Sequence, residues 1–123
     1  MLVFVYGSLK RGHSTHAFLE TADAYFMGEY VTVEQAFDLV DLGSFPGLTK
    51  GNYFVKGELY ELKDIRPIDR LEGHPSFYRR HQIMVQSVHV NPLIRVKAWS
   101  YFIGEGYGDA IEEESAQVKS WGG

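Results

Sequence analysis

The chain has 123 residues, of which 45% are hydrophobic and 23% are charged, a composition typical of one globular domain and not of a disordered chain. Twelve Lys and Arg against 16 Asp and Glu give a net charge of −4, which argues against nucleic acid as the main partner. The absence of cysteine excludes disulfides, thiolate catalysis and cysteine-ligated zinc. It also fits a cytoplasmic protein. No apolar run approaches the roughly 20 residues of a membrane-spanning helix, so no membrane partner is expected.

The N-terminal part of the chain predicts a strand, a loop and a short helix. Residues 2–6 are β-branched or aromatic and end at Gly7, which indicates a buried strand that leads into a loop. Ser14 or Thr15 is expected to cap a helix that continues to about Glu20.

The middle of the chain is expected to be mostly strand. Residues 25–42 are rich in Tyr, Phe and Val and predict one long bent strand or two shorter ones. Residues 45–48 (Phe-Pro-Gly-Leu) are expected to form a turn with proline in second place and glycine in third. Residues 57–62 mix polar and apolar side chains as a half-buried strand does.

A short helix is predicted over residues 65–72. Asp64 is expected to cap it, Pro67 is tolerated in its first turn, and Gly73 is expected to end it. Apolar side chains recur at every third position of this segment, at Ile65, Ile68 and Leu71.

The C-terminal part predicts a hairpin and a last helix. Residues 77–90 and 96–103 read as two strands joined by a turn at Asn91-Pro92, and residues 110–119 are expected to be helical. The whole chain, residues 1–123, is therefore expected to be one α+β domain. We expect a small mixed β-barrel of about six strands with two or three short flanking helices.

Two features of the sequence could carry chemistry. The loop Tyr6-Gly7-Ser8-Leu9 leaves a strand end, where consecutive backbone N–H groups can bind an anion, although an ordinary turn after a core strand explains it as well. Glu72 lies at the C-terminal end of the expected helix. The helix dipole and apolar neighbours would raise its pKa there, whereas a surface glutamate paired with an arginine is the alternative.

Metal binding and serine catalysis are not indicated. His13 and His16 are three residues apart, with His74 elsewhere, but no carboxylate lies at a familiar metal-site spacing. Ser8 lacks the Gly-x-Ser-x-Gly motif of a hydrolase nucleophile. We therefore expect neither a metal nor a nucleophilic serine.

Four motifs, in this order, resemble the γ-glutamylcyclotransferase-like family, and within it the γ-glutamylamine cyclotransferases and their uncharacterised bacterial relatives. They are residues 5–9 (Val-Tyr-Gly-Ser-Leu), 45–48 (Phe-Pro-Gly-Leu), 55–60 (Val-Lys-Gly-Glu-Leu-Tyr) and 68–73 (Ile-Asp-Arg-Leu-Glu-Gly), the last followed by Tyr78-Arg79-Arg80. The resemblance covers nearly the whole chain and is weakest at residues 119–123.

The resemblance implies a function that the residues alone do not establish. It implies conversion of a γ-glutamyl amine or a small γ-glutamyl peptide to 5-oxoproline, with no cofactor. Glu72 would be the catalytic acid and base, residues Tyr6, Gly7, Ser8 and Leu9 would hold the substrate α-carboxylate, and Tyr78 would line the pocket. A non-catalytic protein that binds a small acid on the same fold is the alternative. We expect a monomer or a weak homodimer.

Overall fold

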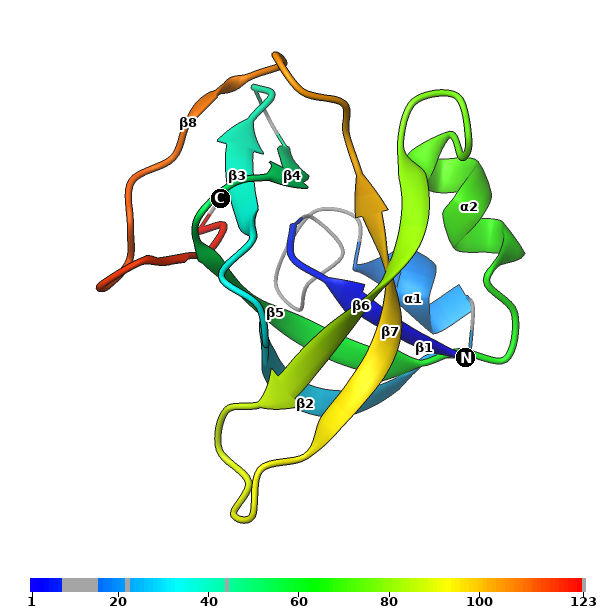
Figure 1. Cartoon of the computed structure of the whole chain (residues 1–123). Coiled ribbons are helices and arrows are strands. Elements are labelled where there is room, and N and C mark those ends of the chain that lie inside the picture. The colour runs from blue at the N-terminus through cyan, green and yellow to red at the C-terminus, as the bar shows by residue number, and fades with distance from the viewer. Residues whose placement is uncertain (8–15, 22, 44, 123) are drawn as a thin grey trace.

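The structure is a computed structural model that describes residues 1–7, 16–21, 23–43 and 45–122. Within these residues the chain forms two helices and nine strands (Figure 1). In chain order they are β1 (Leu2–Val5), α1 (Ala17–Thr21), β2 (Tyr25–Thr32), β3 (Phe37–Asp41), β4 (Pro46–Lys50), β5 (Phe54–Glu61), α2 (Arg66–Glu72), β6 (Arg79–Ser87), β7 (Arg95–Phe102), β8 (Asp109–Ala110) and β9 (Val118–Lys119). Neither helix has the length and apolar character needed to cross a membrane.

Five of the strands form a closed barrel. β1 pairs with β5, β5 with β2, β2 with β6 and β6 with β7, and β7 returns to β1 through a parallel pairing of Val3 with Trp99. The three strands β4, β3 and β8 extend from β7 as a second arm of the sheet. The expected small mixed barrel is confirmed. The described residues form three strands more than the expected six, because residues expected to form a turn belong to β4 and because the two-residue strands β8 and β9 have no signal of their own in the sequence.

One edge of β7 is shared between two strands. β1 pairs with it at Trp99, and β4 pairs with it three residues later, where Leu48 lies beside Phe102. β1 and β4 therefore separate along this edge of β7. The residues that follow β1, Tyr6 and Gly7, lie at this separation, and they lead into the candidate site.

Side chains that alternate between the two faces of each strand form two hydrophobic cores. Val3 and Val5 of β1 face the helices, where they pack with Leu19 of α1 and Ile68 of α2. The intervening Phe4 belongs to the other core, which lies inside the barrel and includes the fully buried residues Leu39, Leu48, Val55, Leu59 and Val85. Figure 1 shows α1 and α2 together beside the end of β1 and β7. The apolar face of α2 is thus fixed against the barrel.

The helix expected over residues 65–72 is confirmed as α2. Ile65 and Ile68 are buried and Leu71 packs against the same core, as the three-residue spacing predicts. Gly73 ends the helix with a φ of 67°, a left-handed conformation that glycine adopts without strain. The N-cap is Ile65 and not Asp64. The Asp64 carboxylate still accepts a hydrogen bond from the backbone N–H of Arg66, at 3.0 Å.

The turn expected at residues 45–48 is wrong, because Pro46, Gly47 and Leu48 belong to β4. Pro46 pairs with Asp41 and Leu48 with Leu39, and the side chains of this second pair are both buried. Proline is compatible with the first position of a strand. Glycine is required at position 47 for packing, because a Cβ there would lie 2.5 Å from Cγ2 of Ile103.

The terminal helix expected over residues 110–119 is also wrong. β8 pairs with β3 and β9 pairs in parallel with β5, so long-range pairing organises this segment. Residues 112–117 between them are exposed and include three consecutive glutamates. The β9 residue Lys119 is buried, and its ammonium lies 2.7 Å from the Asp38 carboxylate and over the Tyr53 ring.

The remaining strand predictions are confirmed. Residues 25–42 form two strands, β2 and β3, and the hairpin of β6 and β7 joins residues 79–87 to 95–102. The caps proposed for the first helix, Ser14 and Thr15, lie outside the described residues, and the helix itself is present as α1.

Candidate active site

The Tyr6 side chain fills the space between β1 and β4. Its hydroxyl donates a hydrogen bond to the Tyr101 carbonyl of β7, at 2.6 Å, and accepts one from the Leu48 N–H of β4, at 3.1 Å. A single buried hydroxyl thus joins β7 to β4 by bonds that resemble those of a strand pair. Burial, followed by the nearby Tyr78 and Glu72, raises the pKa of Tyr6 well above its usual value. Tyr6 therefore stays protonated and acts as a rigid support.

Gly7 follows Tyr6 and packs closely against Pro46. A Cβ at position 7 would lie 2.6 Å from Cγ of Pro46 and 2.8 Å from its Cδ. The ring of Pro46 therefore favours glycine at position 7. Ser8 and Leu9, the rest of this loop, lie outside the described residues.

The backbone after α2 folds back and brings Tyr78 to the end of the helix. The Tyr78 N–H donates to the Glu72 carbonyl at 3.2 Å, and the Phe77 N–H donates to the Gly73 carbonyl at 2.8 Å. The Tyr78 side chain is buried, and its hydroxyl donates to the Pro46 carbonyl at 2.7 Å. Tyr78 therefore connects the end of α2 to the same β4 residue that packs against Gly7.

Glu72 is partly buried at this end of α2. Among the residues that the structure describes, no side-chain hydrogen bond or ion pair to its carboxylate is present. Burial raises the pKa of Glu72 to about 7. Arg80 pairs instead with Asp69, so the alternative of a surface glutamate paired with this arginine does not describe Glu72. A carboxylate with a pKa near neutrality can take up a proton and return it at physiological pH.

Three tyrosines surround this carboxylate. Besides burial, which is the largest cause in each case, the charge of Glu72 contributes to the raised pKa values of Tyr6, Tyr78 and Tyr101. The three rings come from the residue that follows β1, from the segment before β6 and from β7. The sequence predictions of Tyr6, Gly7, Glu72 and Tyr78 as site residues thus fall on one region of the structure. The structure describes their positions, and their roles remain predictions.

A second group of polar side chains lies beside Glu72, one turn earlier on α2. The Asp69 carboxylate accepts hydrogen bonds from Arg80 Nε at 3.0 and 3.2 Å and from the Tyr101 hydroxyl at 2.6 Å. The Arg80 guanidinium lies 4.5 Å from the centre of the Trp99 ring. The backbone N–H of Arg80 donates a hydrogen bond to His74 Nδ1, at 3.2 Å. The sequence analysis did not single out Asp69, Tyr101 or Trp99.

No group of three or more His, Asp or Glu among the described residues is arranged to hold a metal ion. His13 lies outside those residues, and His16 lies against the Tyr60 ring.

Comparison with known proteins identifies the family. The family model described as gamma-glutamyl cyclotransferase, AIG2-like, matches residues 3–122. The chain belongs to this family of enzymes. The expectation from the four sequence motifs is confirmed, and the match also includes most of the C-terminal residues that resemble the family least.

Individual relatives agree with this assignment. A Methanocaldococcus jannaschii protein named "Putative gamma-glutamylcyclotransferase" is 34% identical over 113 residues, which are 89% of this chain and 90% of that protein. The gamma-glutamylaminecyclotransferase of Rattus norvegicus is 38% identical over 97 residues, 68% of this chain and 62% of the rat protein. The crystal structure of a mouse AIG2-like protein has a TM-score of 0.75 at 31% identity, covering 93% of this chain and 89% of the mouse chain.

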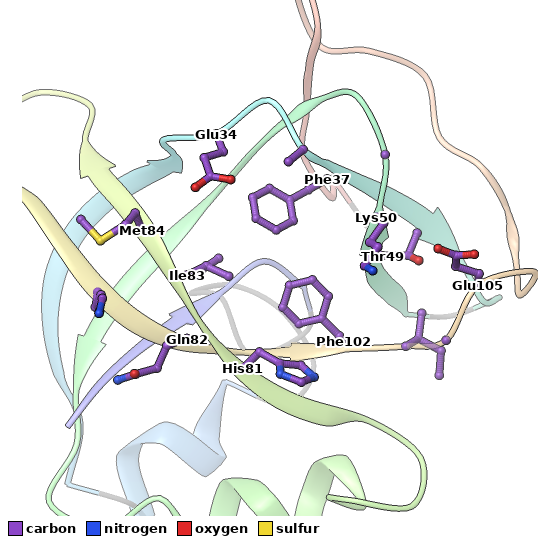
Figure 2. Close-up of a pocket in the computed structure, with 15 residues that line it drawn as sticks. Glu34, Phe37, Thr49, Lys50, His81, Gln82, Ile83, Met84, Phe102 and Glu105 are labelled. Atoms are coloured by element: carbon purple, nitrogen blue, oxygen red, sulfur yellow. The ribbon is translucent and has the colours of Figure 1, made fainter.

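This cyclotransferase-family chain also has a large groove at a different place, with a volume of about 760 Å³. Figure 2 shows the rings of Phe37 and Phe102 in its centre, with Glu34 and Met84 at one end and Lys50 and Glu105 at the other. Its lining does not include Tyr6, Glu72 or Tyr78. The sequence analysis did not predict this groove, because its walls come from β3, β4, β6 and β7.

Proposed function

We propose that the protein is a γ-glutamyl cyclotransferase that converts a γ-glutamyl amine or a small γ-glutamyl peptide to 5-oxoproline and a free amine, with Glu72 as general acid and base. The observation that carries this proposal is the Glu72 carboxylate, which is partly buried, unpaired among the described residues and has a pKa of about 7. The family of the chain supports the same reaction type.

The proposed reaction needs one proton carrier. The substrate α-ammonium gives a proton to Glu72, and the resulting amine attacks the γ-carbonyl carbon, which forms the C–N bond of a five-membered ring. The bond from that carbon to the departing nitrogen then breaks, and Glu72 returns the proton to this nitrogen. The ring nitrogen loses its second proton in this collapse, and the released amine takes it up to become an ammonium ion, so that protons and charge balance. Water is not consumed. Because the attack is intramolecular, holding the substrate in a folded conformation supplies much of the acceleration.

The other predicted residues have positioning roles in this proposal. The loop Tyr6-Gly7-Ser8-Leu9 holds the substrate α-carboxylate through backbone N–H groups. The tyrosine cluster supports this arrangement, because the hydroxyls of Tyr6 and Tyr78 are already engaged by backbone groups and keep Glu72 and the start of the loop in a fixed relation. Tyr78 forms part of the pocket wall beside Glu72.

The test is a panel of γ-glutamyl amines and γ-glutamyl peptides in which 5-oxoproline and the released amine are both measured. Equal amounts of the two products are expected for at least one compound. The matched control is the same compound acetylated on its α-nitrogen, which keeps the amide but lacks the attacking amine, and no release is expected from it. Free glutamate labelled by ¹⁸O-water would instead mean hydrolysis and would refute the cyclisation. Binding without any turnover across the panel would favour the non-catalytic alternative.

A further inference from the structure

The two acidic residues in the last turns of α2 have opposite surroundings. Asp69 is bonded by Arg80 and Tyr101, whereas Glu72 has no such partner among the described residues. We propose that Asp69 is a positioning residue that holds the Arg80 guanidinium away from Glu72, so that Arg80 does not pair with this base. This inference rests on the role proposed for Glu72 above and assigns a function to a pair of residues outside the reacting group.

Helix geometry places the two carboxylates within reach of the same cation. Asp69 and Glu72 are three residues apart on α2, and side chains at this spacing are neighbours on one helix face. Arg80 is a long side chain on β6, the strand that follows α2. Both partners are mostly buried, since 21% of the Arg80 side chain and 17% of the Asp69 side chain are exposed. Without Asp69 as partner, the charge of Arg80 would be left in a poorly solvated place next to one other carboxylate.

The charges of Asp69, Glu72 and Arg80 all affect the Tyr101 hydroxyl. It donates to Asp69 at 2.6 Å, and its pKa is raised by burial, by Asp69 and then by Glu72, while Arg80 opposes the rise. One hydroxyl therefore experiences all three charged groups. The pKa of Glu72 itself is raised by burial.

The groups that face Glu72 make Arg80 the relevant cation among the described residues. The hydroxyls of Tyr6 after β1, Tyr78 before β6 and Tyr101 of β7 stay protonated. Asp69 is the acidic neighbour on α2, and His74 is occupied at Nδ1 by the Arg80 N–H. A cation released from Asp69 would favour the ionised form of Glu72 and lower its pKa.

The experiment measures the ionisation of Glu72 directly by following its side-chain carboxyl ¹³C resonance against pH in full-length protein. Three variants are compared with the wild type: Asp69→Asn, Arg80→Gln and the double variant. Asparagine can still accept the Tyr101 hydrogen bond but cannot neutralise Arg80. We expect Asp69→Asn to lower the pKa of Glu72 by about one unit, as an opposite charge at close range does. The double variant should restore the wild-type value, and Arg80→Gln alone should not lower it.

Two results would overturn the inference. An unchanged or higher Glu72 pKa in Asp69→Asn would show that Arg80 does not approach Glu72. An equally low pKa in the single and double variants would show that loss of the Asp69 charge, and not Arg80, causes the shift. Asp69→Ser, which is smaller and also neutral, replaces Asp69→Asn if the latter does not fold.

The resonance measurement separates this inference from the proposed function, because it needs no substrate. If Glu72 is the base, the rise of kcat/KM with pH should move to lower pH in Asp69→Asn by the same amount. A shifted resonance without turnover in the wild type would support the charge arrangement and refute the cyclotransferase proposal. A purely structural role for Asp69 would reduce activity without moving either pH profile.

Discussion

Adjacent residues of β7 face two different regions of the molecule. Tyr101 faces the helices, where its hydroxyl bonds to Asp69 near the partly buried Glu72. Phe102 faces the open groove, where its ring lies 5.9 Å from that of Phe37. The groove has charged side chains at its ends, Glu34 at one end and Lys50 and Glu105 at the other (Figure 2). The region of Tyr101 has the partly buried Glu72, whose carboxylate has no side-chain hydrogen bond or ion pair among the described residues, and the bonded hydroxyls of Tyr6, Tyr78 and Tyr101.

The two regions differ in how far the fold removes their charged groups from water. Exposed charged side chains, such as Glu105 in the groove, remain in contact with water. A carboxylate that the fold has partly removed from water is held in an unfavourable charged state, and such groups are concentrated at functional sites. The predictions below test this contrast with matched variants in both regions.

Replacing the catalytic candidate should have the largest effect. Glu72→Gln keeps the size of the side chain but removes the basic carboxylate, so turnover should fall by about 10²–10⁴-fold with substrate binding largely kept. The matched control is Glu105→Gln in the groove, which should retain wild-type turnover. Steady-state kinetics with one γ-glutamyl substrate gives both values. Substantial activity in Glu72→Gln would remove Glu72 from the mechanism.

The same substitution should stabilise the protein at alkaline pH. The folded-state pKa of Glu72, about 7, lies above the ordinary 4.5. The folded state therefore binds the Glu72 proton more tightly than the unfolded state does, which stabilises the folded state. This contribution to the free energy of unfolding is complete below the unfolded-state pKa and is lost as pH rises through the folded-state pKa. Between pH 4 and pH 8 the wild type should lose about 3 kcal/mol more unfolding free energy than Glu72→Gln. Urea denaturation of both proteins at pH 4 and pH 8 measures the difference. If the free energy of unfolding of the two proteins had the same pH dependence, burial would not raise the pKa of Glu72.

Gly7→Ala should destabilise the protein by about 1–3 kcal/mol because its methyl group would overlap the Pro46 ring. Pro46 would have to move, and its carbonyl accepts the Tyr78 hydroxyl, so turnover should fall as well. Gly104→Ala is the matched variant in the groove, where the new Cβ would make an ordinary contact 3.5 Å from Tyr107 Cε2. Thermal denaturation should show a loss for the first variant alone. Equal effects of the two would contradict the close packing at Gly7.

Substitutions within the groove should have the smallest effect. Lys97→Gln removes a charge from the groove lining, where no described ion pair involves Lys97. We expect unfolding free energy within about 0.5 kcal/mol of the wild type, as for other surface substitutions, and no change in turnover. A tenfold loss of kcat/KM would instead place the groove on the path of the substrate, and the contrast between the two regions would then be wrong.

The sequence predicted the parts of the fold and site that local signals control. The three-residue spacing of Ile65, Ile68 and Leu71 and the position of Gly73 defined α2 and so placed Glu72 at its end. A raised pKa for Glu72 was expected from the helix dipole and apolar neighbours, and the structure attributes it to burial. This agreement is possible because one helix and its cap determine where the carboxylate lies.

Contacts between residues distant in the sequence could not be predicted from local sequence patterns. The pairing of β3 with β4 converts residues 45–48 from an expected turn to a strand, and the pairing of β9 with β5 replaces an expected helix. The partners of Asp69 are 11 and 32 residues away, at Arg80 and Tyr101, and no periodicity connects them. Such contacts depend on how the barrel closes, which the composition of each segment does not determine.

The Tyr6 hydroxyl between β7 and β4 limits how the length of this chain can vary among related sequences. Side chains alternate between the two faces of a strand, so one residue inserted between β1 and Tyr6 would turn the ring to the opposite face and leave the Leu48 N–H without its acceptor. The hairpin between β6 and β7 has no such restriction, since Val90 and Leu93 are exposed there. Insertions and deletions should therefore accumulate in that hairpin, while the spacing from β1 to Gly7 stays constant.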